Sequence, residues 1–117
     1  MKAGRAFSVT LILLKGSFQG TLNDYNTQLA PLSVYDFTLP EQMMPHELVG
    51  FLVQGIKALC DVAQIPQPAV KVVSVALQGG IEHFTGVVRY CPLFDDNNIN
   101  LMVLLETQLG ITTRIYN

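Results

Sequence analysis

The 117-residue sequence contains no tryptophan, two cysteines and few charges, and each shortage excludes a class of protein. Charged residues make up 14% of the chain, against about 25% in ordinary soluble domains. Because half of the residues are apolar, the chain is not disordered. The seven basic residues and the net charge of −2 argue against nucleic acid, since phosphate binding needs clustered lysine and arginine. No apolar run approaches the roughly 18 residues that cross a bilayer.

The low charge also bears on the partners of this protein. A domain of this size leaves roughly a third of its unfolded-chain surface exposed to water. So few charges on that surface favour its partial coverage by a second copy or by another protein. The alternative is a monomer whose surface is rich in serine, threonine, asparagine and glutamine. The sequence therefore predicts a homo-oligomer, with another protein as the second candidate partner.

The two cysteines and the N-terminal segment bear on the compartment. Cys60 and Cys91 lack the number and spacing of a disulfide framework or a metal site, and we expect buried, unreactive thiols. Residues 1–14 show a faint similarity to a signal peptide. Polar Ser8 and Thr10 interrupt the apolar stretch, however, and no small-residue cleavage site follows it. The sequence therefore favours the cytoplasm.

Hydrophobic periodicity predicts secondary structure along the whole chain. A wide apolar stripe at helical spacing predicts one long helix, which begins between Pro40 and Pro45 and ends by Ile65, before a proline. Alternating or valine-rich segments predict strands, and a polar segment between the first two predicts a loop. The expected strands cover 6–14, 32–39, 69–77, 81–91, 99–107 and 111–116, and the loop covers 20–31.

These elements predict a single α+β domain over residues 1–117. Its expected core is a mostly antiparallel sheet of about five to six strands packed around one long helix, in the order β-β-α-β-β-β-β. Parallel pairing is disfavoured because it would need more crossover helices than the sequence indicates. The order of elements resembles a hotdog-like arrangement, in which the sheet wraps the helix and pairs with a second copy.

No complete catalytic motif is present, but four residues are weak candidates for acid-base chemistry. His46 and Glu47 stand at the start of the predicted helix, where they could act on a bound carbonyl or thioester. Asp36 and His83, on predicted strands, are candidate helpers. A solvated histidine and a carboxylate that complements the helix dipole are the more frequent roles for such residues. The sequence indicates no metal site and no cofactor.

Four further residues are candidates for an interface. Gly50 and Gly55 lie inside the predicted helix, where a glycine costs about 1 kcal/mol relative to alanine. Close approach of another backbone, from the sheet or from a partner, would compensate for that cost. Phe18 and Tyr25, together with the loop between them, offer a surface for a binding partner.

These observations lead to two hypotheses of function. The first is a small self-associating binding protein without catalytic activity, such as an adaptor, an inhibitor or a structural subunit of an assembly. The second is a hotdog-like acyl-thioester hydrolase or dehydratase, with His46 or Glu47 in a cleft between two copies. The absence of a convincing catalytic set favours the first hypothesis and leaves enzyme activity uncertain, leaning against it.

Overall fold

The computed structural model describes residues 6–25, 30–82, 85, 87–91 and 99–116. A five-stranded sheet with the strand order β3-β2-β1-β4-β8 forms its centre. Strands β1, β2 and β3 are antiparallel neighbours, whereas β4 runs parallel to β1 and β8 runs parallel to β4. The five strands are β1 (Phe7–Leu14), β2 (Ser17–Asp24), β3 (Ser33–Thr38), β4 (Val70–Ala76) and β8 (Thr112–Tyr116).

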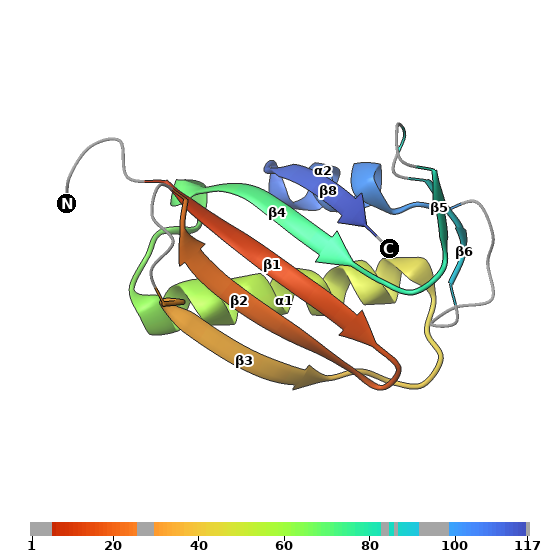
Figure 1. Ribbon diagram of the computed structural model, residues 1–117, viewed down its shortest axis with the longest axis horizontal. Helices are drawn as coiled ribbons and strands as arrows, with labels where there is room; N and C mark the ends of the chain where they lie inside the picture. Colours follow the sequence, from red (N-terminus) through yellow and green to blue (C-terminus); the bar gives the residue numbers. More distant parts are fainter. Residues whose placement is uncertain (1–5, 26–29, 83–84, 86, 92–98, 117) are drawn as a thin grey trace.

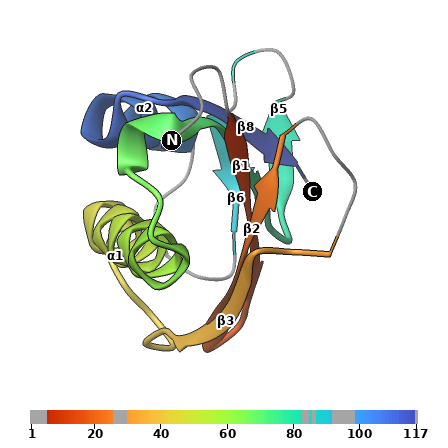
Figure 2. The same cartoon turned by 90° about the vertical axis from the view of Figure 1, so that its left-hand side faces the viewer.

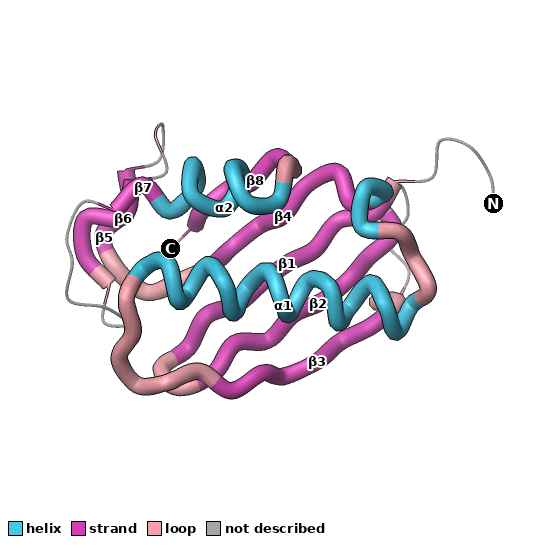
Figure 3. Tube along the Cα trace, turned by 180° about the vertical axis from the view of Figure 1, so that it is seen from behind, coloured by secondary structure: helices cyan, strands magenta, loops and turns pink. Residues whose placement is uncertain are grey.

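Two helices cover one face of this sheet (Figures 2 and 3). Helix α1 (Pro45–Ala63) connects β3 to β4 through the short 3-10 helix η1 (Gln67–Ala69), and α2 (Leu101–Leu109) precedes β8. The other face of the sheet carries no helix in the part of the chain that the structure describes. A second, three-stranded sheet of β5 (Gly80–Glu82), β6 (Val87–Tyr90) and β7 (Ile99–Asn100) lies at one end of the molecule (Figure 1).

The α+β class and the packing of a sheet against one long helix are confirmed. Alternation in β1 sends its apolar residues into the core as the sequence predicts, because successive side chains of a strand point to opposite faces. The buried side chains of β1 are Phe7, Val9, Leu11 and Leu13. Helix α1 contributes the opposing apolar layer, and its buried residues are Pro45, Leu48, Val49, Leu52, Gly55, Ile56, Leu59 and Cys60.

Two segments differ in secondary structure from the prediction, and the single strand expected at 81–91 is divided into β5 and β6. Part of the expected loop at 20–31 belongs to β2, which pairs with β1 along its whole length. A Cβ on Gly20, the first residue of that expected loop, would lie 2.8 Å from Leu59 Cδ1 of α1, so the strand passes close to the helix here. A glycine inside a strand often marks such a close approach.

The second difference is that the expected strand at 99–107 is mostly helix α2. The Asn100 side chain caps this helix by accepting a hydrogen bond from Val103 N at 3.2 Å, and Gly110 ends it in the left-handed conformation (φ +67°). A short apolar run is ambiguous between strand and helix, and here the two caps decide.

The second helix also explains why the sheet is mixed. Helices α1 and α2 both lie on connections between parallel strands, so β4 and β8 join β1 in parallel. Gly79 and Gly80 lie between the expected strands at 69–77 and 81–91, and such a turn signal predicts a hairpin of the two. This hairpin does not form, since β4 pairs with β1 and β8 while β5 pairs with β6. A glycine-rich turn alone did not determine strand pairing.

Candidate functional site

Strands β1, β4 and β8 all end at one edge of the sheet, which we name the carboxyl edge. Ile12, Ala76 and Tyr116 lie side by side there in the parallel register. The chain runs from β1 through β2 and β3 to one side of the sheet, and through β4 and β8 to the other. In open α/β sheets, ligands bind outside the carboxyl ends of the strands at such a reversal of strand order. The carboxyl edge is therefore the candidate site.

The β1–β2 hairpin forms one wall of the carboxyl edge. Its two turn residues are Lys15 and Gly16, and Gly16 has φ +85°, as the second central residue of a type II turn requires. Gly16 O accepts a hydrogen bond from Leu39 N at 2.9 Å. This bond holds the segment that leaves β3 against the hairpin, so the Lys15 ammonium stands on a braced turn.

The ends of β4 and β8 form the centre of the carboxyl edge. Leu77 N donates a hydrogen bond to Tyr116 O at 2.9 Å, which continues the ladder beyond the last paired residues of β4. Gly79 then takes φ +147°, a conformation that side chains rarely adopt, and leads into β5. Residues 77–79 therefore cross the carboxyl edge, and Gly79 adds no side chain there.

Both helices begin at the carboxyl edge (Figure 1). The N-terminal end of a helix carries a partial positive charge and unpaired backbone N–H groups. In α1, part of this potential is neutralised because Glu47 Oε1 accepts a hydrogen bond from Met44 N at 2.8 Å. The sequence predicted the alternative roles of Glu47 in catalysis or at the helix dipole, and this bond supports the second.

The fold does not bring Asp36 near the other two described acid-base candidates, His46 and Glu47. Asp36 pairs in register with Gln19, next to the pair Phe18 and Phe37, whose rings face α1. Because adjacent strand residues alternate between faces, Asp36 lies on the sheet face opposite the helices and opposite His46. The fourth candidate, His83, lies outside the described residues.

The turns that follow β1 and β4 at the carboxyl edge hold no carboxylate. Among the residues that leave β1 and β4, at 15–16 and 77–79, Lys15 is the only charged one. In the described part of the chain, no group of three or more histidine, cysteine, aspartate or glutamate residues could hold a metal ion. Magnesium-dependent phosphoryl transfer uses carboxylate ligands and a base beside the substrate, and residues 15–16 and 77–79 do not supply them. Two carboxylates stand before and at the start of α1, at Glu41 and Glu47, and Glu47 is hydrogen-bonded to Met44 N.

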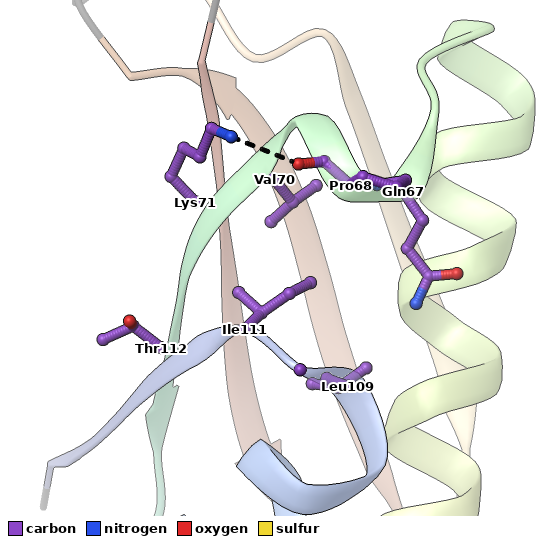
Figure 4. A pocket seen from close by; sticks show the side chains of 8 residues that line it. Gln67, Pro68, Val70, Lys71, Leu109, Ile111 and Thr112 are labelled. Carbon is purple, nitrogen blue, oxygen red and sulfur yellow. Dashed lines mark hydrogen bonds between the residues drawn. The ribbon is translucent and has the colours of Figure 1, made fainter.

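A cavity of about 550 Å³ lies at the opposite, amino edge of β4 and β8 (Figure 4). It is lined by Gln67, Pro68, Val70, Lys71, Leu109, Gly110, Ile111 and Thr112. Lys71 Nζ donates to Pro68 O at 3.4 Å across its rim (Figure 4). The amino ends of parallel strands are not where this class of sheet binds ligands, so the carboxyl edge remains the better candidate.

A second cavity, of about 480 Å³, lies between α1 and α2, and we name it the helix-pair cavity. Two residues singled out from the sequence, His46 and Gly50, line it together with Val49, Val53, Gln54, Leu104, Thr107 and Gln108. None of the lining side chains is a carboxylate, a lysine or an arginine. The cavity therefore offers His46 no acid-base partner.

The four interface candidates occupy different environments. A Cβ on Gly55 would lie 2.8 Å from two ring carbons of Phe18, whereas a Cβ on Gly50 would meet nothing within 4 Å. Phe18 is 2% exposed, so it packs inside the chain and presents no surface to a partner. Tyr25 is 57% exposed, and its role at an interface stays a prediction.

Both cysteines are buried and carry no disulfide, as the sequence predicts. Burial raises the pKa of the Cys60 thiol above its ordinary value, and the neighbouring Asp61 carboxylate raises it further. The thiolate is the reactive form of cysteine. Cys60 is therefore a packing residue of α1.

No helix in the described residues is long and apolar enough to cross a membrane. The sequence matches no protein-family profile, and no curated protein shows significant similarity to it. The fold, in contrast, is that of several solved structures.

The ROK hexokinase from Thermus thermophilus superposes with a TM-score of 0.78 at 15% identity, over 95% of this chain and 35% of that one. The inorganic polyphosphate/ATP-glucomannokinase from Arthrobacter sp. strain KM gives 0.76 at 20% identity, over 96% and 44%. A ROK family transcriptional regulator, a homologue of the E. coli MLC protein, gives 0.72 at 16% identity, over 95% and 27%. This chain thus spans less than half the length of each.

These comparisons correct the functional predictions made from the sequence. The solved structures that share this fold include several sugar kinases. The expectation of a non-catalytic binding protein, and the alternative of a hotdog-like thioester hydrolase or dehydratase, are therefore wrong. At these levels of identity the similarity establishes the fold, and the fold is that of one part of ROK sugar kinases and a ROK regulator.

Proposed function

We propose that this chain forms one part of a sugar-phosphorylating protein and contributes the carboxyl edge to a site for a hexose and a nucleotide. One observation carries the proposal: between 95% and 98% of the chain superposes on sugar kinases. Among them is the Streptomyces griseus glucokinase in complex with glucose and AMPPNP, with a TM-score of 0.74. The proposal includes a cytoplasmic location, because a sugar kinase acts where its nucleotide donor is present.

The geometry of the carboxyl edge supports the same function. Lys15 on its braced hairpin supplies a positive charge, and Gly16 and Gly79 add no side chains to the turns beside it. Both helices add the positive ends of their dipoles at this edge (Figure 1). These features suit a phosphate-bearing ligand better than a hydrocarbon one.

The scarcity of carboxylates limits what these residues could do in such a reaction. Phosphoryl transfer depends on positioning and on metal ions that neutralise charge. The turns that follow β1 and β4 do not fit a magnesium ion, because Lys15 is their only charged residue, and the described residues contain no group of three or more metal-ligating side chains. In this proposal the chain positions ligands, while metal ligands and a catalytic base come from residues outside the described part.

The same scarcity favours one second candidate, a sugar-responsive regulator. The ROK family transcriptional regulator covers 95% of this chain with a TM-score of 0.72. A sensor of this kind needs a sugar site but no phosphoryl transfer. The two candidates therefore differ in nucleotide binding rather than in sugar binding.

A nuclear magnetic resonance titration of the ¹⁵N-labelled chain tests the proposal. With glucose, mannose or AMPPNP at about 10 mM, tenfold above the usual range of KM values, amide shifts are expected at residues 15–17 and 77–80. Lys15→Ala should weaken the AMPPNP shifts, whereas the matched variant Lys71→Ala, at the amino edge, should leave them unchanged.

The outcome of this titration distinguishes the kinase from the sugar-responsive regulator. Shifts with both sugar and AMPPNP support the kinase, and shifts with sugar alone support the regulator. The proposal is overturned if all three ligands leave the carboxyl edge unshifted, or if their shifts gather at residues 67–71 and 109–112 instead.

A further inference from the structure

The two glycines inside α1 have different reasons to be glycine. Gly55 faces the sheet, and the ring of Phe18 occupies the space that a side chain would need. Gly50 faces away from the sheet, and nothing within 4 Å would contact its Cβ. A glycine inside a helix is disfavoured relative to alanine, so the packing of this chain explains Gly55 and leaves Gly50 without a reason.

The surface around Gly50 is weakly charged and hollowed. The helix-pair cavity lies beside Gly50 and is lined by valine, leucine, threonine, glutamine and one histidine. Leu104, on its α2 side, keeps 39% of its surface exposed, and nearby Phe51 keeps 37%. The apolar side chains that line this cavity, Val49, Val53 and Leu104, and the missing side chain at Gly50 suit the close approach of another helix.

The charges along the outer face of α1 are arranged for pairing with an identical helix. The 3.6-residue period places Glu47, Gly50, Gln54 and Lys57 on one exposed face, opposite the buried residues. Glu47 and Lys57 have opposite charges and lie ten residues apart, roughly 15 Å along the axis. When two copies of α1 cross antiparallel with their centre near residue 52, each Glu47 meets the other copy's Lys57.

This register also accounts for Gly50. In it, Gly50 of one copy lies opposite Gln54 of the other, next to the crossing point, where a side chain at position 50 would hold the helices apart. Glu47 remains able to pair because a carboxylate accepts several hydrogen bonds besides the one from Met44 N. The contact is isologous, so one set of residues serves both copies.

We propose that the outer face of α1 around Gly50, with the helix-pair cavity, binds a second copy of this chain through antiparallel pairing of the two α1 helices. The low charge of the whole chain, 14% of residues, agrees with a covered surface. This contact differs from the proposed sugar site, since it uses the outer face of α1 rather than the turns that follow β1 and β4.

Sedimentation velocity between roughly 1 and 300 µM tests the proposal, since a small interface is expected to have a Kd in this range. The unmodified chain should form a dimer. Lys57→Glu should raise the Kd at least about tenfold, because like charges then face each other. The matched variant Lys71→Glu makes the same change of charge on β4 and should leave the Kd unchanged.

Two further variants separate pairing from folding. Gly50→Leu should abolish the dimer while the circular dichroism spectrum and the melting temperature show an intact fold, since the structure leaves space for the side chain. The exchange Glu47→Lys with Lys57→Glu should restore the Kd to within about threefold, because the charges again alternate. A monomer at every concentration overturns the proposal. A dimer that tolerates Gly50→Leu, or a groove that retains a small molecule or an unrelated helix instead, overturns it equally.

Discussion

The inner and outer faces of α1 follow different rules, although they belong to one helix. On the inner face, Gly55 touches the ring of Phe18, and that ring stacks on Phe37 with centroids 4.7 Å apart. On the outer face, Gly50 has open space in the same backbone conformation. The difference shows that two glycines of one helix can have different roles. Packing within the chain requires a small residue at Gly55, whereas it places no such demand on Gly50.

The largest expected effect is on the inner face. Gly55→Leu should lower the free energy of unfolding by about 3 kcal/mol, because overpacking of a filled core is costly and the Phe18 ring has Phe37 behind it. Urea denaturation measures this change, and Phe18→Leu in the same chain should recover part of the loss. An unchanged midpoint for Gly55→Leu would show that the α1–sheet contact is looser than described.

The second helix offers the same contrast at smaller scale. Glu106 Oε2 accepts a hydrogen bond from Thr113 N of β8 at 2.9 Å, whereas Gln108 of the same helix is exposed. Glu106→Ala should cost about 2 kcal/mol, since a partly buried bond to a charged group is lost. Thermal unfolding should show this loss for Glu106→Ala and almost none for Gln108→Ala; equal effects would contradict the contrast.

On the outer face of α1, a substitution should stabilise the chain. Gly50→Ala should add about 1 kcal/mol, because alanine is the better helix former and its Cβ meets no other atom. At dilute concentration, where copies do not pair, the melting temperature should rise by about 4 °C. A fall in melting temperature under these conditions would mean that Gly50 is already packed within the monomer.

The smallest effect concerns the thiol of Cys60. Its pKa is raised above the ordinary value of 9.0, first by burial and then by Asp61. A raised folded-state pKa contributes stability that is present below the unfolded pKa and is lost as the pH rises through the folded one. Stability should therefore decline above about pH 9, less so in Cys60→Ala, as urea titrations at several pH values would measure. Thiol reagents should react with Cys60 only after unfolding.

Local patterns were sufficient for the longest elements of this fold. Alternation placed Phe7, Val9 and Leu11 on the inner face of β1, and the helical stripe located most of α1, because both signals repeat over many residues. The pattern misassigned β2 and α2. The polar residues of 20–31 suggested a loop although residues 20–24 pair with β1, and the run after Ile99 suggested a strand although Asn100 and Gly110 cap a helix.

The candidate site was less accessible to sequence reasoning than the fold. Residues Lys15 and Gly16 carried a turn signal, but nothing in the sequence related them to residues 77–79. That proximity depends on the parallel pairing of β1 with β4, which are separated along the chain by two strands and a helix. The acid-base candidates looked plausible one by one, and the tertiary structure placed Asp36 and His46 on opposite sides of the sheet.

The sequence by itself determined the α+β class, the inner faces of β1 and α1, and the burial of Cys60 and Cys91, because these follow from the periodicity and polarity of neighbouring residues. Only the tertiary structure decided the parallel half of the sheet, the carboxyl edge and the different roles of Gly50 and Gly55. Those features depend on contacts between residues distant in sequence, such as Gly55 with Phe18. Strand order and side-chain packing, which set those contacts, leave no local pattern in the chain.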